Sequence, residues 1–300
     1  MMSAVNPEVP TLSFPWLRLR TALWRFETLP LATKRFSALP PSSFVRRSLF
    51  GYDLFLDLQR SNAHRLLYLE GKRYIEERHV LRRLVDPGMT VVDVGANIGY
   101  YMLLLARLVG PTGHLVCLEP EPGNFSELSR NRAANALGNV RLLQAAAGAE
   151  DGTIGFMRGL NGTVADSGPG DLEARVLRLD SLTDVTPDLV KIDVEGYEGH
   201  VLAGASGLLR DRRPALFVEL HPWLLYPPYS VDEIFTFLGR FYPAPRVFAR
   251  SADESLAAKL LHRYLGAESI EELPNPLEAL RPGGARHEES VWIVCLPDPG

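Results

Sequence analysis

The sequence predicts a doubly wound α/β fold, with a mostly parallel sheet of seven strands and helices on both faces. Short apolar segments alternate with amphipathic helical segments from residue 88 onward, the pattern of a parallel sheet covered on both sides. The chain of 300 residues is 46% hydrophobic and 23% charged, which is ordinary for a globular protein and argues against a disordered, collagen-like or coiled-coil chain. No apolar run approaches the roughly 18 residues of a membrane span, so we expect no transmembrane segment.

The first part of the chain is predicted to be a basic, partly helical extension over residues 1–60. Apolar residues recur at helical spacing between Trp16 and Phe26, and Pro30 ends that segment. Residues 1–85 carry 14 Lys and Arg against 7 Asp and Glu, whereas the rest of the chain carries 18 against 29. The extension is either a solvated helix docked on the acidic body or an arm that makes peripheral contact with an anionic membrane or an acidic partner.

Residues 61–300 are predicted to form the α/β domain. A hairpin-like segment and a helix over 61–85 precede the first strand, residues 152–180 read as irregular, and residues 251–289 read as a polar insertion before the last strand. Strands are expected at 90–95, 114–119, 139–146, 189–194, 214–220, 246–249 and 289–297, and helices at 100–109, 124–137, 197–209 and 231–241.

A glycine-bearing turn, Asp93-Val94-Gly95-Ala96-Asn97-Ile98-Gly99, joins the first strand to its helix. Ligands approach backbone amides at such turns. The dinucleotide fingerprint fails here, because Asn97 and Tyr100 occupy the positions of its second and third glycines. Glu119 ends the next strand, where an acid can bind both hydroxyls of a ribose. The pattern favours an adenosine ligand without a diphosphate, and S-adenosylmethionine meets that description.

A second group of ionisable residues is expected at the carboxyl ends of the fourth and fifth strands, the edge at which α/β sheets bind ligands. Its members are Lys191, Asp193, Glu195, Glu198, Glu219 and His221. In an extended strand Lys191, Asp193 and Glu195 point to one side, whereas Glu198 falls in the first turn of the following helix.

Several roles are open to this group. Crowded carboxylates need a proton or a cation to relieve their repulsion, so Asp193, Glu195 and Glu219 are candidate ligands of a divalent cation. His221 is a candidate general base for an alcohol, and Asp193 or Glu195 could serve instead. The alternative roles are structural: Lys191 as an ion-pair partner of Asp193, and Glu198 as a helix N-terminal charge.

Four separated motifs resemble the FkbM family of S-adenosylmethionine-dependent methyltransferases. They are DVGANIGYYMLLLARLVGPTGHLVCLEPEPGNFSEL from residue 93, RLDSL at 178–182, KIDVEGYE at 191–198 and RRPALFVELH at 212–221. The resemblance covers roughly residues 72–222, and the motifs occur in the family's order. It implies a class I methyltransferase-like fold and transfer of a methyl group to a hydroxyl of a small molecule or glycan.

The resemblance also implies roles for individual residues. It places Asp93, Gly95, Asn97, Gly99, Glu119 and Pro120 around the cofactor, Ala146 against adenine, and Glu76 and Asp193 near the methionine end. Where the family often has an aspartate after the strand-three glycine, this chain has Ala149. N-methylation of an amino sugar or small amine, and a cofactor-binding module without catalysis, are the alternative functions.

The remaining expectations concern surroundings and partners. The acidic body argues against nucleic acid as a substrate, because phosphate contacts need Lys and Arg. Cys117 and Cys295 lie inside apolar runs and read as buried thiols. Together with the lack of a signal-peptide pattern, they suggest a cytoplasmic protein. The sequence does not indicate an oligomeric state.

Overall fold

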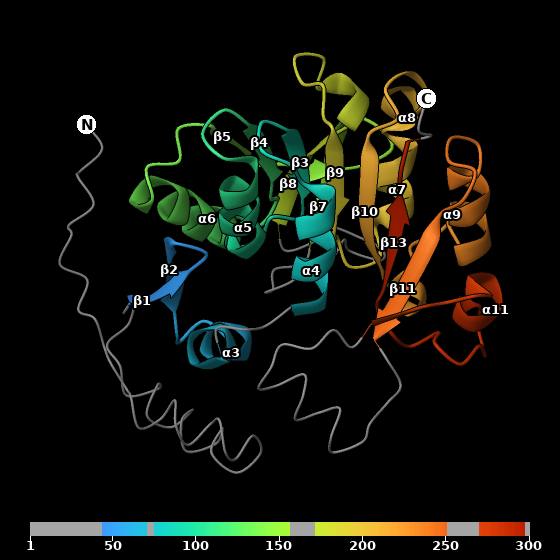
Figure 1. The fold of residues 1–300 in the computed structure, drawn as a ribbon, viewed down its shortest axis with the longest axis horizontal. Helices are drawn as coiled ribbons and strands as arrows, with labels where there is room; N and C mark the ends of the chain where they lie inside the picture. The colour runs from blue at the N-terminus through green and yellow to red at the C-terminus, as the bar shows by residue number, and fades with distance from the viewer. Residues whose placement is uncertain (1–43, 71–74, 157–171, 251–269, 298–300) are drawn as a thin grey trace, which may run out of the picture.

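The structure, a computed structural model, describes residues 44–70, 75–156, 172–250 and 270–297. Its main sheet has eight strands in the order β12-β11-β13-β10-β9-β3-β4-β5 (Figure 1). The seven predicted strands are present, and β12, a strand of three residues, is added at one edge. The predicted helix between residues 16 and 26 lies outside the described residues.

The centre of the sheet is parallel, and its C-terminal part contains the reversed strands. β3 pairs in parallel with β4 and β9, whereas β13 is antiparallel to both β10 and β11. The strands of this sheet are β3 (Thr90–Val94), β4 (His114–Leu118), β5 (Val140–Leu143), β9 (Leu189–Ile192), β10 (Ala215–Leu220), β11 (Arg246–Arg250), β12 (Ile270–Glu272) and β13 (Val291–Cys295). The parallel strands therefore end at one edge, where the predicted ionisable residues lie.

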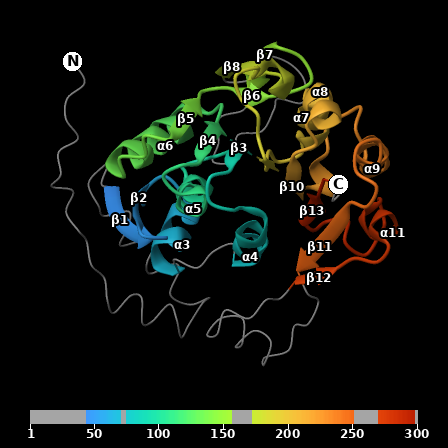
Figure 2. The same cartoon turned by 45° about the horizontal axis from the view of Figure 1, so that its top comes forward.

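Each face of the sheet packs into its own apolar core, because successive strand residues point to opposite sides. Val91 lies in the core under α4 (Ile75–Leu84) and α5 (Tyr100–Val109), whereas Val92 lies in the core on the other face. The other face is covered by α7 (Glu198–Ala203), α8 (Ser206–Asp211), α9 (Val231–Leu238) and α11 (Pro276–Leu280) (Figure 2). The predicted arrangement of helices on both faces is confirmed.

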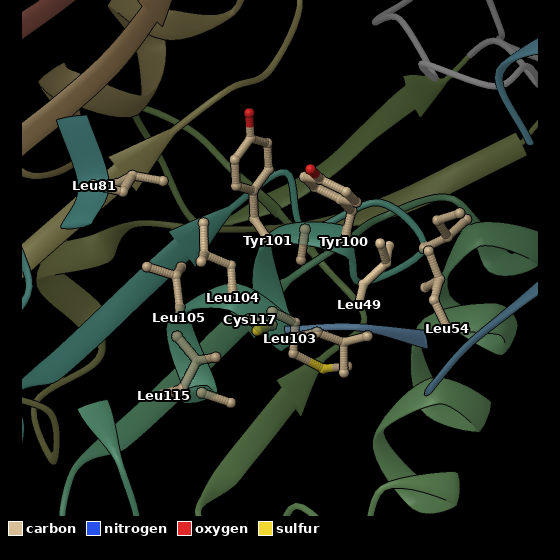
Figure 3. Packing of buried hydrophobic residues seen from close by; sticks show 14 of the residues in the cluster. Leu49, Leu54, Leu81, Tyr100, Tyr101, Leu103, Leu104, Leu105, Leu115 and Cys117 are labelled. Atoms are coloured by element: carbon tan, nitrogen blue, oxygen red, sulfur yellow. The ribbon is translucent and has the colours of Figure 1, made fainter. Parts of the chain in front are cut away.

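The hairpin expected within residues 61–85 lies earlier in the chain. It consists of β1 (Phe44–Leu49) and β2 (Tyr52–Asp57), and the segment after it forms α3 (Asn62–Glu70) and α4. Figure 3 shows Leu49 and Leu54 of this hairpin beside the α5 residues that pack into the core. In β1 the polar run Arg46-Arg47-Ser48 separates the buried Val45 from the buried Leu49, so the sequence shows no clear strand alternation there.

A second sheet forms where an irregular segment was expected. β6 (Ala146–Ala147), β8 (Leu172–Leu177) and β7 (Gly152–Phe156) make a sheet of three strands. Two glycines in β7 hid its strand character, because glycine is weakly favoured in strands. Among the helices of the described residues, none is long and apolar enough to cross a membrane.

Candidate functional site

The turn after β3 is shaped by close backbone approach. Gly95 has φ +83°, and a Cβ there would lie 1.9 Å from the backbone oxygen of Asp193. Gly95 and Ala96 both donate their N–H groups to the carbonyl of Leu118, which ties the turn to the end of β4. Asn97 adopts φ +49°, a conformation that a non-glycine residue seldom takes. Only glycine therefore fits at residue 95.

Glu119, at the tip of β4, is almost completely buried and already held in place. Its Oε2 accepts from the Asn97 N–H at 2.9 Å, and its Oε1 accepts from the Glu121 N–H at 2.9 Å and from Asn124 Nδ2 at 3.3 Å. A carboxylate has about four lone-pair sites, so one acceptor position remains on Oε2. Burial raises the pKa of Glu119 to about 7, against the lowering effect of these bonds. The remaining acceptor position on Oε2 fits a ribose hydroxyl that donates to it.

Asp93 and Lys191 form a buried ion pair beneath the two turns. The Lys191 Nζ lies 3.0 Å from Asp93 Oδ1 and 3.6 Å from Asp193 Oδ2, and it sits 4.5 Å from the ring centre of Tyr101. Burial lowers the pKa of Lys191, but the two aspartates outweigh that effect and the pKa is raised. Asp93 is fully buried, and its carboxylate pairs with Lys191 at the base of the glycine turn.

The fourth strand ends earlier than the sequence predicts. β9 ends at Ile192, and Glu195 and Gly196 both have positive φ, of +52° and +98°. Glu195 is therefore not on an extended strand beside Lys191, as expected, but turned towards the tip of β10. At this turn Gly95 packs against the Asp193 carbonyl and Gly196 against the Leu224 carbonyl, so neither glycine position has room for a side chain.

Glu198 and His221 form a buried pair. His221 Nδ1 lies 2.8 Å from Glu198 Oε1, and the same oxygen accepts the Gly196 N–H at 3.0 Å. With Nδ1 bound to Glu198, the Nε2 of His221 faces Glu195 at 3.5 Å and Glu219 at 3.9 Å. Burial lowers the pKa of His221, but Glu198, Glu195 and Asp193 outweigh it and raise the pKa to about 9.

The carboxylates facing His221 are themselves perturbed. Burial raises the pKa of Glu195, and burial together with the charge of Asp193 raises the pKa of Glu219 well above its ordinary value. One ligand atom each of Asp193, Glu195 and His221 lie within 4.8 Å of one another. Such a group can take up a proton, a cationic group or a divalent ion; Glu219 is not part of it.

The other predicted cofactor residues lie on the loop after β4, on β6 and at the start of α5. Pro120 follows Glu119 at the start of the loop to α6 (Pro122–Ala134), and Ala146 is buried in β6. Gly99 has φ +96° at the start of α5. The side chain of Glu76 lies outside the described residues.

Two residues near this edge were not predicted from the sequence. Glu77, next to Glu76, is fully buried, with Arg250 Nη2 3.6 Å from its Oε1, and its charge helps to raise the pKa of Glu219. Its spacing from Val80 and Leu81, which share the buried face of α4, was the available signal. Trp223 follows His221 closely, is 40% exposed, and packs edge-on against its ring with centres 5.6 Å apart. Nothing in the periodicity indicated that exposure.

With this geometry in place, comparison with known proteins assigns the class. Residues 93–244 match the model of the Methyltransferase FkbM domain, which is half of the chain. The chain belongs to the FkbM methyltransferase family.

Individual relatives match this chain over only part of its length. A hexuronic acid methyltransferase, AglP, of Haloferax volcanii is 30% identical over 155 residues, which is 48% of this chain and 62% of that protein. A protein-L-isoaspartate O-methyltransferase of Methanothrix thermoacetophila is 35% identical over 69 residues, 23% of this chain and 30% of that one. The chain thus spans less than two thirds of either relative.

Solved structures resemble it more loosely. An FkbM methyltransferase of Methylobacillus flagellatus has 16% identity and a TM-score of 0.41, over 73% of this chain and 54% of that chain. The TYW2 protein of M. jannaschii, solved with AdoMet, has 14% identity and a TM-score of 0.45, over 86% and 89% of the two chains.

Proposed function

We propose that this protein transfers a methyl group from S-adenosylmethionine to a hydroxyl of a small molecule or glycan. The observation that carries the proposal is the buried Glu198–His221 pair, whose second ring nitrogen, Nε2, faces Glu195 at the edge of the sheet where the cofactor turn also ends. An alcohol is a weak nucleophile until its proton is removed, and a histidine oriented by a carboxylate is suited to that task.

In this proposal each part of the site has one task. S-adenosylmethionine, when bound, supplies the electrophilic methyl group. Glu119 and the turn at Asn97 hold the ribose, and the Lys191–Asp93 pair keeps the two loops in register. Glu198 fixes the ring of His221, and Nε2 takes the proton of the acceptor hydroxyl. Alignment of the reacting atoms contributes most of the rate.

The protonation of His221 sets a condition on this mechanism. With a pKa of about 9, the ring is an imidazolium at neutral pH and must lose a proton before it acts as a base. A positively charged ligand in the cofactor site would lower that pKa, because like charges disfavour the imidazolium. Glu195, 3.5 Å from Nε2, is the alternative base and the first acceptor of that proton.

Trp223 supports a ring-shaped acceptor. Its exposed ring beside His221 provides a flat apolar face, on which the carbon side of a sugar can pack while a hydroxyl reaches Nε2. The relative from Haloferax volcanii carries the name of a hexuronic acid methyltransferase, which also favours a sugar. The carboxylates at this edge favour a neutral sugar over an anionic one.

The test is a methyl-transfer assay with labelled S-adenosylmethionine and three sets of acceptors: neutral methyl glycosides, the matching uronic acids and the matching amino sugars. We expect the methyl group on an oxygen of a neutral sugar, with loss of activity in His221→Asn. Transfer to the nitrogen of an amino sugar that His221→Asn leaves unchanged would instead establish N-methylation. Binding of S-adenosylmethionine with no transfer to any acceptor would favour the cofactor-binding module.

A divalent cation is the competing use of Asp193, Glu195 and His221. A metal-bound His221 could not act as a base, so the two interpretations exclude each other. If His221 is the base, EDTA leaves the rate unchanged and Mg²⁺ or Mn²⁺ does not raise it. Loss of activity in EDTA, restored by one of these ions, would establish the metal instead.

We also propose a cytoplasmic location and a division of the chain into two parts. Cys117 and Cys295 are both buried free thiols, in keeping with a reducing cytoplasm. We propose the α/β domain at residues 61–300 as the catalytic unit, with residues 1–60 as its extension. No nucleic-acid substrate is proposed.

A further inference from the structure

We infer that Arg60 is a positioning residue of the cofactor site, through which the N-terminal hairpin takes part in holding S-adenosylmethionine. Arg60 lies outside the family match at 93–244, in the turn between β2 and α3. The inference deepens the proposed function at the level of cofactor binding only, and it does not depend on the identity of the acceptor.

The guanidinium of Arg60 joins three side chains of the loop and helix that follow Glu119. Nη2 donates to Glu121 Oε2 at 2.7 Å and to Asn124 Oδ1 at 2.8 Å, and Nη1 donates to Glu127 Oε1 at 2.5 Å. The guanidinium packs tightly against Gly123, because a Cβ at that residue would lie 2.7 Å from Nη2. The side chain of Arg60 is 22% exposed, so these charge-assisted bonds are partly shielded from water.

The contact with Asn124 carries the effect to the cofactor residue. Arginine can only donate, so it selects the oxygen of the Asn124 amide and leaves Nδ2 to face Glu119 Oε1 at 3.3 Å. Without Arg60 the bond to the amide oxygen is lost, and this orientation of Asn124 is held less firmly. Arg60 thus fixes the orientation of one of the three donors that hold Glu119.

The second contact acts on the same carboxylate through the start of α6. Glu121 accepts the Asn124 N–H at 2.6 Å as the helix N-cap, and its own N–H donates to Glu119 Oε1. Arg60 holds the Glu121 side chain in that capping position and offsets its charge, which lies beside that of Glu119. Loss of Arg60 would loosen the cap and leave adjacent carboxylates uncompensated.

An independent link ties the same hairpin to the glycine turn. The fully buried side chain of Asn131, on α6, accepts the N–H of Phe55 at 2.7 Å and donates to the carbonyl of Ile98 at 2.8 Å. Strand β2 of the hairpin and the turn that carries Asn97 therefore share one side chain. The hairpin is therefore joined both to the segment after Glu119 and to the glycine turn, the two parts of the proposed ribose site.

The test is calorimetric titration of the full chain with S-adenosylmethionine. We expect Arg60→Ala to weaken binding about tenfold, the size of one or two lost charge-assisted bonds. Arg60→Lys, which keeps the charge but not the planar fork, should recover only part of the affinity. Arg46→Ala is the matched control: Arg46 lies on the same hairpin in an exposed pair with Asp53, and its loss should change the affinity less than twofold.

A double-mutant cycle separates positioning from stability. If Arg60 acts through Glu119, Arg60→Ala added to Glu119→Ala causes less than a twofold further loss. An equal tenfold loss in both backgrounds, with a matching drop in melting temperature, would show a structural role and overturn the inference, as would wild-type affinity in Arg60→Ala. Failure of the wild type to bind S-adenosylmethionine would count against the proposed function itself, so the two failures are distinguishable.

Discussion

The two halves of the site are built differently. The cofactor half depends on backbone: Gly95 meets the carbonyl of Asp193, and the N–H groups of Asn97 and Glu121 hold Glu119. The acceptor half depends on side chains from separate strands, joined by the Glu198–His221 pair. Apart from its contact with Asp193, the first half lies between Gly95 and Asn124, whereas the second is assembled only by the pairing of β9 with β10. Binding and catalysis should therefore be separable by mutation.

The largest effect is expected from His221 in the acceptor half. His221→Asn should lower kcat by about 10²- to 10⁴-fold, because general-base catalysis contributes that much, and leave the Kd for S-adenosylmethionine unchanged. Steady-state kinetics with the acceptor found by the panel would measure it. The control is His200→Asn, since His200 stacks on Tyr197 and bonds the Pro227 carbonyl away from His221. Equal effects of the two variants would remove His221 from the chemistry.

The pH dependence of the rate tests whether His221, in the acceptor half, acts as a base. His221 has its pKa raised to about 9, so the ring is protonated below that pH and becomes a base above it. We expect kcat/KM, which reports on the free enzyme, to rise about tenfold per pH unit from pH 7 and to level off near pH 9. A flat profile over this range would mean that no base of this kind acts.

In the cofactor half, Gly95→Ala is expected to have the largest effect. A Cβ would overlap the Asp193 carbonyl at 1.9 Å, and φ is +83°, so we expect a loss of about 3 kcal/mol in unfolding free energy and no binding of S-adenosylmethionine. Urea unfolding and calorimetry measure the two effects. Gly138→Ala, where no atom lies within 4 Å of the added carbon, is the control and should be nearly neutral.

The sequence predicted the two halves unequally well, and the reason is physical. The turn at Gly95 to Gly99 and the acid at Glu119 are local features whose spacing can be read directly. The pairing of Glu198 with His221 depends on the early end of β9 and on positive φ at Glu195, where the chain packs closely against Gly95 and Leu224. Tertiary contacts of that kind leave no periodic signal.

The docking of the hairpin was likewise not predictable from the sequence. Its docking depends on Arg60 and Asn131, polar residues that look like surface residues in the sequence but bond to partners more than 30 residues away. The alternation of short apolar segments with helical segments, in contrast, was enough to predict the seven strands and the helices on both faces. Glu77 was not predicted from the sequence, because a glutamate in a charged helical segment looks like a surface residue.

A smaller effect is expected on cofactor affinity as the pH falls. Burial raises the pKa of Glu119 to about 7, so the carboxylate is ionised above that pH and protonated below it. Ribose hydroxyls donate to the ionised form, and affinity should fall about tenfold between pH 8 and pH 6. Titrations across this range measure it. Constant affinity from pH 5.5 to 8 would show that the charge of Glu119 is not used.

The smallest effect is expected at Trp223. Trp223→Ala should raise the KM for the acceptor about tenfold with little change in kcat, and Trp223→Phe should keep most of the apolar face. Initial rates at saturating S-adenosylmethionine measure this split. An unchanged KM in Trp223→Ala would place the acceptor elsewhere.

The central claim is that Glu119 and the turn before it hold S-adenosylmethionine. Its most direct test is calorimetric titration of wild type, Glu119→Ala and Glu150→Ala, the last being an exposed glutamate that serves as the control. We predict micromolar binding to the wild type and the control, and a loss of at least about thirtyfold in Glu119→Ala, equivalent to about 2 kcal/mol. Wild-type affinity in Glu119→Ala would contradict the account.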